Sequence, residues 1–228
     1  MGMRTIALVH SPFLGPGSMR PLADVLVARG HRVVVPDLRD GLRATPCHDG
    51  IAARFAAQVP GEPLLVAGHS GAGPLLPHLA RPRPGSHVVY VDAGLPTPGR
   101  SWHDTAPAEL YDTLASGATV EDTGDRTELL LQPWHTWFDP SPLTSEALRD
   151  AVLPDEPRVP VRFLREPRPH TDEPPSAYLR LSAPYDSAAE HARARHLPVR
   201  SLPASHLATV DDPEPVAAAV ETLARALD

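Results

Sequence analysis

Short runs of apolar residues alternate along the chain with segments in which apolar residues recur at helical spacing. A strand with one face in water alternates apolar and polar residues, whereas these runs are apolar almost throughout. Such continuous runs are typical of parallel strands that are buried on both faces. We therefore predict six buried strands, at residues 5–9, 31–36, 63–67, 87–91, 178–182 and 198–202.

Helices are predicted between these strands. Ile51, Phe55 and Val59 are spaced four residues apart and so share one face of a helix. Ser18 is predicted to cap the start of the first helix and Gly30 to end it, and Asp212 before a proline begins the last helix. This alternation predicts the α/β class, with an open, mostly parallel six-stranded sheet and helices on both faces. Right-handed crossovers then bring the carboxyl ends of the strands to one edge, where ligands bind in such sheets.

Residues 95–175 interrupt this alternation. The segment follows the fourth strand, is rich in Pro, Asp and Thr, and contains all three tryptophans. Helices are expected near residues 107–116, 125–132 and 144–152. We interpret the segment as a lid or cap inserted into a single domain that spans residues 1–228, because the alternation of strands and helices resumes after it.

Composition and charge narrow the function classes. The formal net charge of −7 argues against a nucleic-acid partner or an anionic membrane surface. All 21 basic residues are arginine, so lysine Schiff-base chemistry and P-loop ATPases are excluded. Cys47 is the single cysteine, which excludes an internal disulfide and a cysteine-based zinc cluster. With no apolar run long enough for a membrane span or a secretion signal, we expect a cytoplasmic protein without metal or organic cofactor.

The most specific chemical signal is Gly-His-Ser-Gly-Ala at residues 68–72, between a predicted strand and a predicted helix. A serine in such a turn sits on a strained backbone, and its small neighbours let the strand and the helix approach closely. Its hydroxyl then projects at a helix N-terminus, whose N–H groups can stabilise an oxyanion. Ser70 is therefore predicted to be a nucleophile.

With this motif the chain resembles the α/β-hydrolase superfamily, and the resemblance covers nearly its whole length. Residues 9–10 (Val-His) resemble the family's oxyanion loop, and residues 68–72 resemble its nucleophile elbow. Asp186, after a late strand, resembles the acid, and His206, after the last strand, resembles the catalytic histidine. The order Ser, Asp, His is the one the family uses. The family's first strands are missing, which implies a compact member.

The resemblance implies a role for each residue of a catalytic triad. Ser70 would be the nucleophile, His206 the general base, and Asp186 the acid that orients the imidazole. Only 20 residues separate the last two, so Asp92, at the end of the fourth strand, stays open as the acid, with Glu166 a third candidate. His69 is expected to line the pocket or orient the elbow.

The oxyanion loop departs from the family pattern. Where the family has His-Gly-x, this chain has His-Ser-Pro, and Pro12 has no N–H to donate. The Gly71 N–H would then be joined by the N–H of Phe13 or the hydroxyl of Ser11. A hydroxyl residue after this histidine is similar to the hydroxynitrile lyase and plant methylesterase branch. Losing one oxyanion donor costs about 100- to 1000-fold in kcat, which favours chemistry other than ordinary ester hydrolysis.

The lid is expected to supply the pocket wall. Residues 131–138 contain Trp134, Trp137 and Phe138, although aromatic residues make up only 5% of the chain. These side chains can pack the lid against the sheet, line an apolar ligand pocket, or do both.

Three functions remain open at this stage. The first is a serine hydrolase that acts on a small apolar ester, lactone or thioester through an acyl-enzyme. The second is a non-hydrolytic lyase, cyclase or epimerase of bacterial secondary metabolism with the same fold, in which His206 is the general base. The third is a ligand-binding module without catalysis. The expected partner is a small-molecule substrate, with no nucleic acid and no membrane, and a homo-oligomer stays open.

Overall fold

A parallel sheet forms the centre of the molecule. The computed structural model describes residues 4–122, 126–137 and 143–228. Its main sheet has six parallel strands in the order β2-β1-β3-β4-β7-β8. They are β1 (Thr5–Val9), β2 (Arg32–Val34), β3 (Leu65–His69), β4 (His87–Val91), β7 (Ser176–Arg180) and β8 (Val199–Ser201). The predicted fold class is confirmed, and each predicted strand overlaps an observed one.

Helices cover both faces of this sheet. They are α1 (Arg20–Ala28), α2 (Cys47–Gln58), α3 (Leu76–Ala80), α8 (Asp186–Ala194), α9 (Ala208–Asp211) and α10 (Pro213–Arg225). Helices α1 and α10 pack on one face, and α2, α3 and α8 pack on the other. The longest described helix, α10, has 13 residues, and nowhere in the described part of the chain is a helix long and apolar enough to cross a membrane.

The strands are apolar throughout because each one contributes side chains to two cores. In β1, Leu8 packs with α1 and α10, whereas Val9 packs with α2 and α3. Val88 and Val89 of β4 divide in the same way. All four are completely buried, and each burial of this kind contributes about 1.5–3 kcal/mol to the free energy of folding.

The strand register aligns the carboxyl ends of the strands at one edge. Val9 of β1 lies opposite Gly68 of β3, His69 opposite Val91 of β4, and Val91 opposite Leu179 of β7. The segments that follow β1, β3, β4 and β7 therefore leave the sheet side by side. Polar residues in these segments are brought together although they are far apart in the sequence.

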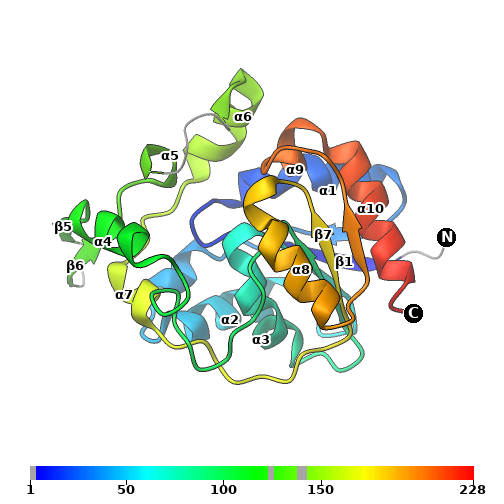
Figure 1. Ribbon diagram of the computed structural model, residues 1–228, viewed down its shortest axis with the longest axis horizontal. Helices are drawn as coiled ribbons and strands as arrows, with labels where there is room; N and C mark the ends of the chain where they lie inside the picture. Colours follow the sequence, from blue (N-terminus) through cyan, green and yellow to red (C-terminus); the bar gives the residue numbers. More distant parts are fainter. Residues whose placement is uncertain (1–3, 123–125, 138–142) are drawn as a thin grey trace.

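The segment between β4 and β7 builds a separate set of small elements. They are α4 (Ala108–Ser116), β5 (Thr119–Asp122), β6 (Thr127–Leu130), α5 (Trp134–Trp137), α6 (Glu146–Val152) and α7 (Val161–Arg165). Figure 1 shows α4, α5 and α6 (green) to one side of the sheet and its helices. Tyr111, Leu148 and Phe163 from this segment belong to the same core as Val9.

Two local predictions are wrong. The helix expected at 125–132 is, from residue 127, the strand β6, which pairs antiparallel with β5. Its Thr-Glu-Leu-Leu sequence is too short for a stable helical stripe, and the neighbouring strand supplies its hydrogen bonds instead. Ser18, expected to cap the first helix, lies inside a 3₁₀ turn (Pro16–Met19), and its hydroxyl donates to the Gly15 carbonyl at 2.7 Å.

Candidate active site

Ser70 occupies a strained turn directly after β3. Its φ angle of 57° lies in the left-handed region, which non-glycine residues rarely adopt. A 3₁₀ turn (Ser70–Leu75) follows and leads into α3. The turn is tightly packed: a Cβ atom at Gly68 would lie 2.4 Å from the Leu76 side chain, and one at Gly73 would lie 2.0 Å from the Gly94 carbonyl oxygen. These contacts explain the small residues in the motif and directly after it, and the geometry is that of a nucleophile elbow.

The Ser70 hydroxyl begins a chain of buried hydrogen bonds. The Oγ atom lies 3.1 Å from Nε2 of His206, and Nδ1 of His206 lies 2.8 Å from Oδ2 of Asp92. Ser70 and His206 are 8% and 7% exposed, and Asp92 is fully buried. A serine, an imidazole and a carboxylate in this order form the arrangement that activates a serine hydroxyl for nucleophilic attack.

Asp92 is fixed by several donors at the end of β4. Its Oδ1 atom accepts hydrogen bonds from the backbone N–H groups of Leu181 (2.8 Å) and Ser182 (3.0 Å), and the Ser182 hydroxyl donates to Oδ2. Burial alone would raise the pKa of Asp92. The hydrogen bonds from His206 and Ser182 outweigh this effect and hold the pKa below its usual value. Asp92 is therefore an anion that can orient the imidazole of His206.

The expectation that Asp186 is the acid is corrected by this geometry. Asp186 begins α8, its side chain is 58% exposed, and its carboxylate lies 2.6 Å from the Arg180 guanidinium. Asp92 holds the imidazole nitrogen that the acid of a triad would bind. The third candidate, Glu166, instead accepts hydrogen bonds from the backbone N–H groups of Cys47 and His48 and from the His48 ring.

His69 contacts His206 through a hydrogen bond and through ring packing. Its Nε2–H donates to the backbone carbonyl of His206 at 2.8 Å, and the two rings have their centroids 4.5 Å apart. Burial lowers the pKa of His69 to about 3, so the ring is neutral. The sequence led us to expect that His69 lines the pocket or orients the elbow, whereas its observed hydrogen bond is to the histidine loop.

Tyr185 is a site residue that the sequence reasoning missed. Its hydroxyl lies 3.2 Å from Ser70 Oγ, and its ring stacks on His206 with centroids 5.0 Å apart and planes 7° apart. Burial raises the pKa of Tyr185 to about 12, so the phenol keeps its proton at neutral pH. Its position directly before Asp186 was the available signal, because the resemblance had already placed that loop near the site.

Replacing Tyr185 by phenylalanine tests this contact. The hydroxyl helps to hold Ser70 Oγ toward His206, and a neutral hydrogen bond is worth about 0.5–1.5 kcal/mol. We expect kcat with an activated ester to fall about 2- to 10-fold, with an unchanged melting temperature. A loss of more than about 100-fold would contradict a positioning role and indicate that the phenol itself transfers a proton.

The oxyanion loop lies against the elbow. The Phe13 N–H donates to Ser11 Oγ at 3.2 Å, and a Cβ atom at Gly71 would lie 2.9 Å from the same oxygen. His10 fixes the loop, because its Nε2 accepts from the Leu38 N–H at 3.1 Å and its Nδ1–H donates to the Ser11 carbonyl at 2.8 Å. The structure thus brings all three expected groups, Ser11, Phe13 and Gly71, together beside Ser70.

A small cavity adjoins this loop. It has a volume of about 20 Å³, and its walls contain apolar and charged side chains. The lining residues are Phe13, His48, Gly71, Pro74, Leu75, Trp102, Phe163, Glu166 and Arg168. The cavity therefore begins at the residue after the candidate nucleophile.

The aromatic wall differs from the expected one. Trp137 packs edge-on against Phe13 with centroids 5.7 Å apart, so it supports the cavity wall. Trp134 is 4% exposed and belongs to the hydrophobic core. Trp102, which lies outside the aromatic run of the sequence, lines the cavity itself and lies 6.3 Å from the Phe13 ring. Phe138 lies outside the described residues.

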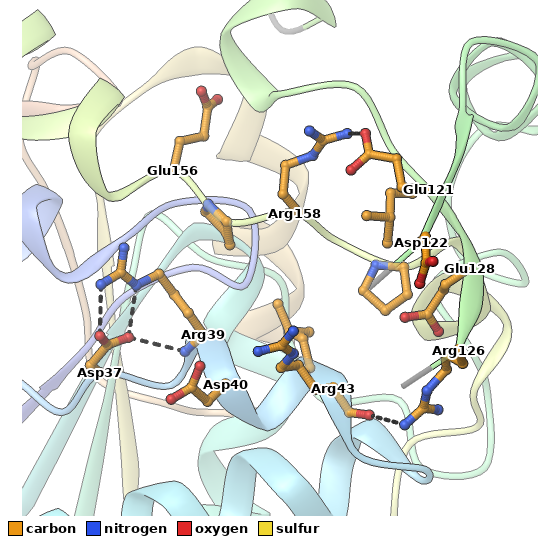
Figure 2. Close-up of a pocket in the computed structure, with 14 residues that line it drawn as sticks. Asp37, Arg39, Asp40, Arg43, Glu121, Asp122, Arg126, Glu128, Glu156 and Arg158 are labelled. Atoms are coloured by element: carbon orange, nitrogen blue, oxygen red, sulfur yellow. Dashed lines mark hydrogen bonds and ion pairs between the residues drawn. The ribbon is translucent and has the colours of Figure 1, made fainter. Parts of the chain in front are cut away.

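A larger, highly charged cleft of about 600 Å³ lies between the 3₁₀ helix Arg39–Arg43 and the β5–β6 hairpin (Figure 2). Its acidic and basic side chains largely pair with one another. Arg39 contacts Asp37 at 2.8 Å, and Arg158 pairs with Glu121. None of Ser70, Asp92 and His206 lines it. In the parts of the chain described, no cluster of three or more His, Cys, Asp or Glu residues could hold a metal ion.

Comparisons with known proteins give matches among solved structures. No protein-family model and no curated protein sequence matches the chain. Among solved structures, a variant of tomato methylketone synthase I complexed with β-ketoheptanoate matches over 100% of both chains, with a TM-score of 0.75 and 13% identity. Polyneuridine aldehyde esterase covers 98% of this chain and 100% of its own, with a TM-score of 0.72 and 15% identity.

An extracellular alpha/beta-hydrolase from a Paenibacillus species matches 96% of this chain and 98% of its own length, with a TM-score of 0.70 and 18% identity. The chain has the α/β-hydrolase fold. In the α/β-hydrolase fold the elbow serine comes first, the acid second and the histidine last along the chain. Ser70, Asp92 and His206 keep this order, with the acid after β4 instead of after β7.

Proposed function

We propose that the protein is a serine hydrolase that cleaves a small ester, lactone or thioester through an acyl-enzyme. The observation that carries this proposal is the buried hydrogen-bond chain from Asp92 through His206 to the strained Ser70. The left-handed backbone at Ser70 costs about 1–3 kcal/mol, and strain of this kind is concentrated at functional sites.

The reaction would proceed in two halves. Ser70 Oγ attacks the carbonyl carbon while His206 Nε2 takes the hydroxyl proton, and the Asp92 carboxylate stabilises the imidazolium that forms. His206 then gives the proton to the leaving oxygen or sulfur as that bond breaks. In the second half His206 activates water, which attacks the acyl carbon and releases Ser70. Throughout both halves the substrate carbonyl oxygen faces the oxyanion loop.

The Ser11 hydroxyl can replace the backbone N–H donor that Pro12 lacks. Its Oγ accepts from the Phe13 N–H and lies beside Gly71, and within the described chain its own proton has no acceptor. The Ser11 hydroxyl is therefore free to donate toward an oxyanion together with the Gly71 N–H. This pair of donors supports hydrolysis in spite of the proline.

Covalent labelling tests the proposal. A fluorophosphonate probe should modify Ser70 alone, because among the serines that the structure describes only Ser70 has its hydroxyl next to an imidazole. Intact-mass measurement and peptide mapping would show one adduct on wild type and on Ser116→Ala, whose serine is exposed on α4, and none on Ser70→Ala. A folded wild-type protein without an adduct would overturn the hydrolase proposal.

A second candidate is a lyase, cyclase or epimerase that uses His206 as the general base. Pro12 is the specific observation that favours it, because a hole without a second backbone donor penalises acyl transfer more than proton abstraction. One structural neighbour is named a methylketone synthase, so the solved structures that resemble this chain include a protein that is not named as an esterase or hydrolase. In this mechanism Ser70 would relay or position a proton, without a covalent intermediate.

A further inference from the structure

Arg168 is a buried cation beside the cavity next to the elbow. It lies between α7 and β7 and is 8% exposed. Its two Nη atoms donate to the hydroxyls of Thr97 and Thr105, the latter at 3.2 Å. Within the described chain no carboxylate lies within ion-pair distance of Arg168, whereas Arg29, Arg39 and Arg162 each have at least one. A buried charge without a counter-ion is costly, so its presence calls for an explanation.

Arg83 shows what a purely structural buried arginine looks like in this protein. It is 4% exposed and has no carboxylate partner among the described residues, but all three of its guanidinium nitrogens donate to backbone carbonyls, of Pro60, Leu79 and Val59. Its guanidinium also lies over the Phe55 ring. Arg168 has only two hydroxyl partners and faces a cavity. Its donors are therefore less completely used than those of Arg83.

The charge of Arg168 persists at neutral pH. Burial lowers the pKa of Arg168 to about 10, so the guanidinium stays protonated. Asp104 and Arg100 act on it from a distance with opposite signs, and the Asp104 carboxylate accepts its hydrogen bonds from Ser101. Glu166 also lines the cavity, but its oxygens are taken by two backbone N–H groups and the His48 ring. The Glu166 anion is therefore already bound, whereas the Arg168 guanidinium on the cavity wall keeps N–H donors for a ligand.

The position of this centre relates it to the reaction. Gly71 and Phe13, which flank the proposed oxyanion site, line the same cavity, and the rings of Trp102 and Phe163 form apolar walls. A volume of about 20 Å³ admits a group of roughly the size of a water molecule or a carboxylate oxygen. The planar guanidinium fork matches a carboxylate in geometry.

We infer that this cavity receives the end of the acyl chain, and that Arg168 binds a carboxylate there, so that the preferred substrates are esters or thioesters of short dicarboxylic acids. The inference rests on the proposed hydrolase function, because it assigns the acyl half of the substrate to the cavity beside Gly71. It changes the expected substrate from a wholly apolar acyl group to one with an anionic end.

A pair of esters tests this preference. The value of kcat/KM is measured for p-nitrophenyl acetate and for the mono-p-nitrophenyl ester of glutaric acid, whose acyl chain ends in a carboxylate. Wild type should favour the glutarate ester at least 10-fold. Arg168→Gln should lower the ratio between the two esters by about 10- to 100-fold, and Arg168→Lys should restore part of it.

Thr105→Val is the matched control, because it removes a bracing hydrogen bond of Arg168 and keeps the cation. It should leave the ratio of the two esters unchanged. If Arg168 only stabilises the chain near residues 97–105, both Thr105→Val and Arg168→Gln will lower kcat/KM by the same factor for the two esters. That result, or equal turnover of both esters by wild type, would overturn the inference while Ser70-dependent hydrolysis stands.

Direct binding separates this inference from the hydrolase proposal. Calorimetry with Ser70→Ala protein should detect glutarate but not the neutral glutaramide, and the further change Arg168→Gln should abolish the glutarate signal. Binding of neither compound, or of both equally, would overturn the carboxylate site even if Ser70 is labelled. Arginine-dependent glutarate binding without Ser70-dependent turnover would support the site and contradict the hydrolase.

Discussion

Replacing Asp92 by asparagine is expected to lower kcat/KM for an activated ester by about four orders of magnitude. The asparagine amide cannot act as the anion that faces Nδ1 of His206, so the imidazole is held in the wrong tautomer to accept the Ser70 proton. The fold should survive. The φ angle of Asp92 is 43°, and asparagine tolerates this left-handed region better than most residues.

Asp186→Asn is the matched control for this prediction. That side chain is 58% exposed, and its ion pair with Arg180 contributes little in solvent. We expect kcat/KM to stay within about twofold of wild type. Steady-state kinetics on both variants, with circular dichroism to check folding, decides the point. A reversed result, with the large loss at Asp186, would show that the acid follows β7 and that the observed Asp92 contact is not the working one.

The arrangement of the fold could be predicted because both faces of each strand are buried. Continuous apolar runs between turn-rich segments, such as residues 5–9 and 87–91, are too short for a helix and rich in β-branched residues, which is typical of buried strands. The elbow could also be predicted from the sequence. A side chain at Gly73 would collide with the Gly94 carbonyl oxygen, so the turn around Ser70 requires small residues. His206 followed from its place after the last strand.

The acid could not be assigned from spacing along the chain. Asp92 and His206 are 114 residues apart, and they meet because β4 and β7 are neighbours and the loop after β8 folds back over their ends. Asp186 has the expected place in sequence, but it falls in the first turn of α8, where a carboxylate is favourable for a different reason, the helix dipole. The sequence around Asp186 was therefore consistent both with the acid of a triad and with a carboxylate at the start of a helix.

The lid was the least predictable part. Local patterns identified α4 and α6 within a few residues, because both carry an apolar stripe, whereas β6 depends on its partner strand β5 for hydrogen bonds. The aromatic run at 131–138 directed attention to Trp134 and Trp137. Trp102 reaches the cavity from a loop whose path is set by contacts such as that of Arg168 with Thr105. No pattern along the chain encodes such a contact.

Ser70→Ala is expected to remove nearly all turnover of an activated ester and to leave only the residual rate that the oxyanion site and substrate binding provide. If Ser70 forms the covalent bond, its removal leaves no nucleophile, and the loss is about as large as that from His206→Ala, because the triad acts as a unit. In the general-base alternative, Ser70→Ala would retain measurable activity, whereas His206→Ala would lose about 100- to 10,000-fold. Rates of both variants with the natural or a surrogate substrate separate the two mechanisms.

The most direct test of an acyl-enzyme on Ser70 is to trap it. Wild-type protein is mixed with p-nitrophenyl acetate, quenched with acid within the first turnover, and measured by intact-mass spectrometry followed by peptide mapping. The proposed mechanism predicts a mass increase of one acetyl group on the peptide that contains Ser70, and none in Ser70→Ala. Release of p-nitrophenol by wild type at a rate that Ser70→Ala reproduces, with no acetyl group on Ser70, would contradict it.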